Sequence, residues 1–139
     1  MRALSQTVLL KLIYSLRKPA IAPLLVFGIH ILGLVSNFYR YITSFPVDIP
    51  LHFFGAAAMA FFLQRAFTSA SEFGIVGQYH ALTHRLLVFT STCTVAVFWE
   101  FAEFLMDRGL GTGFQKSTAD TIADLFLGVA GTLFVIILS

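Results

Sequence analysis

TADTIADLFLGVAGTLFVIIL, residues 118–138, is the stretch of sequence that decides the fold of this chain. It opens with two acidic residues, Asp120 and Asp124, and then continues to Leu138 without another charged side chain. An apolar helix of this length can cross the roughly 30 Å hydrocarbon core of a bilayer. We therefore predict a transmembrane helix here, with both acidic residues near one of its ends.

Three further apolar segments precede this stretch. Residues 20–38 contain no charged side chain, and residues 48–67 and 82–106 are also predominantly apolar. Hydrophobic residues make up 58% of the 139 residues and charged residues only 12%, whereas soluble domains carry about 25% charged residues. These values predict an all-α, polytopic membrane protein with about four transmembrane helices and the lipid bilayer as its main partner.

The first 18 residues differ from the apolar segments. Leu4, Val8 and Leu12 recur at helical spacing, whereas Lys11 and Arg17 fall largely elsewhere around the helix. This pattern is typical of an amphipathic helix that lies on a membrane surface. We predict an N-terminal amphipathic interfacial segment over residues 1–18 and a four-helix transmembrane domain over residues 19–139.

The Lys and Arg residues indicate an orientation in the membrane. With the N-terminus in the cytoplasm, six of them face the cytoplasm and three, Arg40, Arg108 and Lys116, face the outside. Cytoplasmic loops are generally the richer in basic residues. We therefore expect both termini to be cytoplasmic.

Charge and cysteine content exclude two classes of partner or site. The basic residues are scattered, with no run that would follow a phosphate backbone, so we expect no nucleic-acid partner. Cys93 is the single cysteine, so neither a disulfide nor a cysteine-based metal site is expected within one chain.

The acidic residues gather toward one half of the membrane. In the expected topology six of the seven, all except Glu72, lie in the outer half. Within each segment they are three, four or seven positions apart, so each set lies on one helix face. The predicted metal ligands are His52, Glu100, Glu103, Asp120 and Asp124, with Asp48, Asp107, Gln115, Lys116 and Arg40 as supporting polar residues.

Two interpretations of this polar set remain open. Carboxylates at membrane depth are costly and normally face a protein interior or a water-filled cavity. Oxygen ligands with one imidazole suit a divalent metal such as Mg, Mn, Zn or iron, so the set predicts a cation site open to the outer face. The alternative is a polar network that only holds the helices together. We also expect His30 and Asn37 to face the other helices, because a polar stripe in lipid is unfavourable.

The order of these motifs resembles a known family. Asp48-Ile-Pro-Leu-His52-Phe53, Trp99-Glu100-Phe-Ala-Glu103 and Asp120-Thr-Ile-Ala-Asp124, together with Asp107, Gly111, Thr112 and Gln115, are similar to the YjdF-like bacterial inner-membrane proteins and, more distantly, to VanZ-like proteins. The resemblance covers residues 45–135. It implies a multi-pass inner-membrane protein and no particular reaction, and the chain is shorter than many of these proteins.

Three classes of function follow from these observations. One is a cation-binding or transport module, for which we expect a homodimer because four spans make a small transporter. Another is a metal-dependent membrane enzyme acting on a lipid head group or a lipid-linked phosphate, although no GxSxG, P-loop or HExxH motif occurs. The last is a structural or accessory membrane protein.

Overall fold

The computed structural model describes residues 5–35 and 48–139. Within these residues the chain is all-helical and contains no strand. The helices are α1 (Gln6–Leu16), α2 (Ile21–Val35), α4 (Asp48–Glu72), α5 (Ala81–Leu110) and α6 (Thr118–Leu138).

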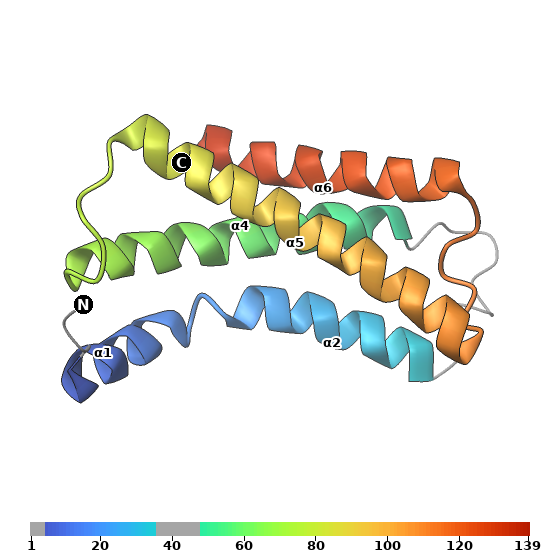
Figure 1. Cartoon of the computed structure of the whole chain (residues 1–139), viewed down its shortest axis with the longest axis horizontal. Helices are drawn as coiled ribbons and strands as arrows, with labels where there is room; N and C mark the ends of the chain where they lie inside the picture. Colours follow the sequence, from blue (N-terminus) through green and yellow to red (C-terminus); the bar gives the residue numbers. More distant parts are fainter. Residues whose placement is uncertain (1–4, 36–47) are drawn as a thin grey trace.

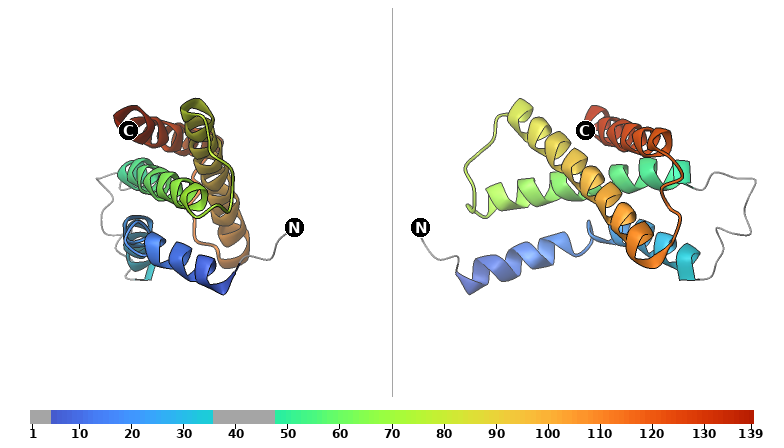
Figure 2. Two further views of the ribbon diagram at one scale, coloured as in Figure 1. Left: turned by 90° about the vertical axis from the view of Figure 1, so that its left-hand side faces the viewer. Right: turned by 45° about the vertical axis from the view of Figure 1, so that its right-hand side comes forward.

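The helices form an elongated bundle with α4 at its centre. α4 packs against each of the other described helices, and α5 also packs against α6 (Figure 1). α4 and α6 run in the same direction, whereas α5 runs the opposite way and crosses them diagonally (Figures 1 and 2). This arrangement brings the first turns of α4 and α6 and the last turns of α5 to the same end of the bundle.

The contact between α4 and α6 depends on small residues. A Cβ atom added at Gly131 would lie 2.2 Å from the backbone oxygen of Phe53, so the two helices approach closely only because glycine is present. Ala60 on α4 and Thr132 on α6 are completely buried nearby. Small residues at helix interfaces are characteristic of membrane proteins, where close packing replaces the hydrophobic effect between helices.

A structured loop joins α5 to α6. Gly111 ends α5 in the left-handed conformation, with φ of 66°, which glycine adopts without strain. The Asp107 carboxylate accepts hydrogen bonds from the Thr112 hydroxyl and, at 2.7 Å, from the backbone N–H of Phe114. Ser117 caps the N-terminus of α6 by accepting from the Asp120 N–H. These contacts fold the loop back over the end of the bundle.

The polarity of the fold is inverted relative to a soluble protein. Large apolar side chains such as Leu24, Phe126 and Ile137 are exposed, whereas Glu100 and Glu103 are buried. A lipid solvent accounts for both observations, because hydrocarbon accepts apolar surface and excludes carboxylates. The expectation of an all-α fold with an apolar, lipid-facing surface is therefore confirmed.

The structure supports fewer membrane-spanning helices than the sequence predicts. Of the described helices, α5 and α6 are long and apolar enough to span a membrane. The bent pair formed by residues 6–16 and 21–33, whose axes meet at 61°, would provide a third span if it crosses as one unit. α4, which carries Gln64, Arg65 and Glu72, is not among these candidate spans. Four transmembrane helices plus an interfacial helix are thus not confirmed.

Candidate functional site

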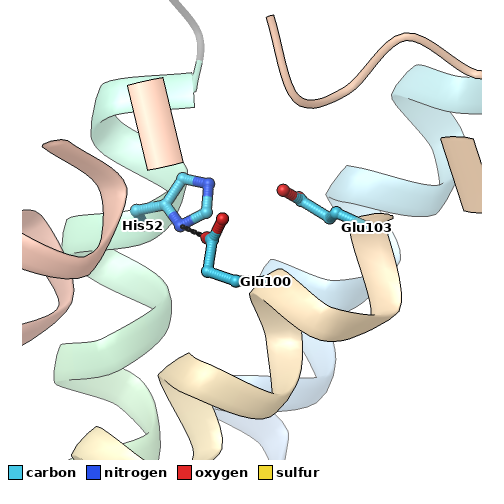
Figure 3. A group of neighbouring side chains, drawn as sticks. All are labelled: His52, Glu100 and Glu103. Carbon is cyan, nitrogen blue, oxygen red and sulfur yellow. Dashed lines mark ion pairs between the residues drawn. The ribbon is translucent and has the colours of Figure 1, made fainter. Parts of the chain in front are cut away.

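Three side chains from α4 and α5 converge near the end of the bundle. His52 lies in the second turn of α4, and Glu100 and Glu103 lie one turn apart on α5 (Figure 3). Each offers a potential ligand atom, and the three atoms lie within 4.8 Å of one another. In the part of the chain that the structure describes, this is the one such group of three or more His, Cys, Asp or Glu residues. We refer to His52, Glu100 and Glu103 as the central cluster.

The His52 ring lies between two carboxylates from different helices. Its Nδ1 atom is 3.7 Å from Glu100 Oε1 on α5, and its Nε2 atom is 3.8 Å from Asp124 Oδ1 on α6. Both distances exceed that of a direct hydrogen bond. The imidazole on α4 thus lies close to a carboxylate of α5 and a carboxylate of α6.

All three carboxylates near this ring are removed from solvent. Glu100 is 4% exposed, Glu103 is 3% exposed and Asp124 is 6% exposed. Burying a charged carboxylate is strongly unfavourable unless it is paired, hydrogen-bonded or bound to a metal. The site therefore requires compensating partners for its carboxyl groups.

Hydrogen bonds fix both glutamates of the central cluster. The Trp99 indole N–H donates to Glu103 Oε1 at 2.8 Å, across one turn of α5. The Gln115 side-chain amide donates to the backbone oxygen of Glu100 at 3.0 Å and to its Oε2 atom at 3.4 Å. The sequence prediction gave Gln115 a supporting role but did not include Trp99 among the polar residues of the site, although the four-residue spacing of Trp99 and Glu103 is a signal for such a contact.

The remaining predicted site residues lie around the central cluster, or their side chains lie outside the part of the chain that the structure describes. Asp120 is paired with Lys116, whose Nζ atom is 3.8 Å from Asp120 Oδ1, and Asp120 is not part of the central cluster. Asp107 is engaged by the α5–α6 loop. Asp48 opens α4, but its side chain, like Arg40 and Asn37, lies outside the described residues.

A cavity of about 150 Å³ adjoins the central cluster between α2, α4, α5 and α6. His30 on α2 is buried beside it, with its ring centre 5.0 Å from that of Trp99 and 5.7 Å from that of Phe114. The expected inward orientation of His30 is therefore observed. The residues lining the cavity are Pro23, Val26, Phe27, His30, Leu51, His52, Gly55, Ala56, Met59, Thr92, Val95, Ala96, Trp99 and Gly128.

Comparison with known families adds a classification. The family DUF2238, described as a predicted membrane protein, matches residues 3–139. The chain belongs to the DUF2238 family. The expected membership of a membrane-protein family is thereby confirmed, whereas the YjdF-like and VanZ-like names are not confirmed by this description. No curated protein and no solved structure matches the chain.

The chemistry available in this DUF2238 protein follows from its donor set. One partly buried imidazole and two buried carboxylates can hold a divalent cation or share protons. Ion binding and proton sharing are therefore the chemistry that these three side chains offer directly.

Proposed function

We propose that this DUF2238 protein binds a divalent cation at the central cluster, within a polytopic membrane domain. The observation that carries the proposal is the convergence of three potential ligand atoms within 4.8 Å on nearly buried side chains. Three ligands arranged around one ion at about 2.1 Å are about 3.4 to 3.6 Å apart. Rotamer changes that draw the three atoms together by up to about 1.4 Å would thus bring them into one coordination sphere.

A cation would resolve the electrostatics of the cluster. Glu100 and Glu103 bring two carboxylates close together in a buried setting, where like charges repel strongly. A divalent ion supplies two positive charges at that point. The mixed donor set of one nitrogen and two carboxylate groups is compatible with zinc, manganese or ferrous iron.

Asp124 has a distinct role in this proposal. His52 Nδ1 faces Glu100 and would be the ligating atom, which leaves Nε2 toward Asp124. A carboxylate on the far side of a ligating histidine commonly fixes the ring orientation and raises its basicity. Asp124 therefore positions His52, and Asp120, paired with Lys116, does not contribute a ligand.

Direct ion binding tests the proposed site. Detergent-purified protein dialysed against Zn²⁺ or Mn²⁺ is expected to retain one ion per chain, measured by elemental analysis. Glu103→Gln keeps the side-chain size but removes a ligand charge, so we expect the affinity to fall by about tenfold or more. Glu72→Gln is the matched control, because Glu72 is exposed at the far end of α4. Equal retention by the wild type and Glu103→Gln would contradict the site.

We also infer that α4, α5 and α6 each cross the inner membrane, that the α1–α2 region makes a fourth crossing, and that both termini are cytoplasmic. The antiparallel course of α4 and α5 supports this topology, as does the 25-residue length of α4, about 37 Å. A reporter fused after Ser139 is expected to be active when it requires the cytoplasm and inactive when it requires the outer side. The reverse pattern would rule this orientation out.

A further inference from the structure

The cavity beside the central cluster has two chemically different ends. His30, His52 and Trp99 line the end nearest the cluster. Pro23, Met59 and Thr92 line the opposite end, where the Thr92 hydroxyl is already donated to the Val88 carbonyl at 2.8 Å. The cavity is thus polar at one end and effectively apolar at the other.

The size of the cavity suits a short length of hydrocarbon. His52 and Met59 are seven positions apart, which corresponds to about 10 Å along the helix. Its volume is about 150 Å³. An apolar protein cavity of roughly 150 Å³ stays free of water and takes up an apolar molecule of about six carbons. Hydrocarbon therefore fits this space better than water does.

The cavity adjoins a seam between α2 and α5 that is filled by side chains. Among the described residues, α2 packs closely against α4 but not against α5 or α6. It reaches α5 through rings instead, since the centres of Phe27 and Trp99 are 6.0 Å apart, edge to face. The Phe27 side chain is exposed on the surface of the protein. Side chains rather than closely packed backbones thus close this seam.

We propose that the cavity binds one hydrocarbon chain of a membrane lipid, which enters between α2 and α5 with its polar end toward His52. Apolar walls, an elongated shape and a side-chain seam facing the bilayer support this occupant. Binding of the hydrocarbon chain in the cavity does not itself depend on the cation. The placement of the polar end at His52 rests on the proposed function of the central cluster.

Trp99 allows the proposal to be tested at one position. It is the single tryptophan and lies at the cavity wall, so its fluorescence reports on this place alone. The protein is reconstituted into phosphatidylcholine vesicles with ordinary or brominated acyl chains, since bromine quenches tryptophan fluorescence on contact. The ratio of the two signals measures acyl-chain contact with Trp99.

Gly55→Leu is designed to fill the cavity. A Cβ atom at Gly55 would meet only Val26 Cγ1, at an ordinary 3.5 Å, and the remaining carbons of leucine would enter the cavity. We expect quenching by brominated lipid to fall by about half because the chain is displaced. Gly28→Leu adds the same side chain at an exposed position with nothing within 4 Å, and is expected to leave quenching unchanged.

Equal quenching in the wild type and Gly55→Leu would overturn the proposal, because the bromine would then contact Trp99 from ordinary surrounding lipid. Gly55→Val provides the same comparison with a smaller side chain if leucine prevents folding. The ratio is expected to be unchanged by a chelator. The quenching ratio therefore measures binding of the lipid chain, and elemental analysis measures binding of the cation. Either proposal can fail without the other.

Discussion

Glu100→Gln is expected to abolish most of the cation-dependent stability of the protein. Glutamine has nearly the same size and can still accept from the Gln115 amide, but it removes the charge that faces His52. An ion present at 100 times its dissociation constant stabilises a folded protein by about 2.7 kcal/mol. The wild type should therefore unfold at a higher temperature with Zn²⁺ than with a chelator, whereas the variant should show little difference.

Thermal unfolding in detergent, with Zn²⁺ or with a chelator, gives this comparison. Glu72→Gln controls for the loss of one negative charge and should retain the full response to Zn²⁺, since Glu72 is exposed and outside the cluster. A polar network without a cation predicts the opposite sign, because removing one of two close carboxylates relieves their repulsion. A chelator-insensitive wild type, less stable than Glu100→Gln, would exclude the cation site.

Gly131→Ala is expected to destabilise the bundle severely. The added Cβ would lie 2.2 Å from Phe53 O and 3.2 Å from the Ala57 nitrogen. Both are backbone atoms, so α4 and α6 must move apart instead of repacking a flexible side chain. Overpacking usually costs about 1 to 3 kcal/mol, and a backbone clash belongs at or beyond the upper end of this range. The same displacement would separate His52 from Asp124.

The matched controls for this variant are other glycines. Gly28→Ala adds a methyl group in open space on α2 and should be neutral or slightly stabilising, because alanine favours helix over glycine by about 1 kcal/mol. Gly128→Ala should be intermediate, since its Cβ meets the Ala96 Cβ at 3.3 Å. Thermal unfolding in detergent ranks the three variants. A melting temperature for Gly131→Ala equal to that of the wild type would contradict the close contact of α4 and α6.

The helices themselves were largely predictable from apolar runs and their flanking residues. α6 has the expected bounds, Thr118–Leu138, because Ser117 caps its start and an uninterrupted apolar run follows. α4 extends to Glu72, beyond the expected end near residue 67. The apolar run ends there, but no helix-breaking residue occurs until Gly74, so the helix continues. The end of an apolar run therefore predicts where contact with lipid ends. It does not predict where the backbone hydrogen bonds of the helix end.

The composition of the candidate site was only partly predictable. Helical spacing placed Glu100, Glu103 and Asp107 on one face of α5. The structure turns Asp107 to the loop, because the turn at Gly111 brings loop N–H groups to its carboxylate. That geometry cannot be derived from helical periodicity. The expected topology already ran the segments of α4 and α6 in the same direction, with His52 and Asp124 at similar depth. Their side-by-side position depends in addition on the direct packing of α4 against α6, which local spacing does not determine.

The diagonal course of α5 has a mechanical consequence. α5 contains 30 residues, about 45 Å in length, whereas the 21 residues of α6 span about 32 Å, close to the thickness of the hydrocarbon core. A helix longer than the core relieves this hydrophobic mismatch by tilting. Glu100 and Glu103 lie on α5, Asp124 lies on α6, and both helices are long and apolar enough to span a membrane. We therefore expect a change in bilayer thickness to change the tilt of α5 and to move these carboxylates relative to one another around His52.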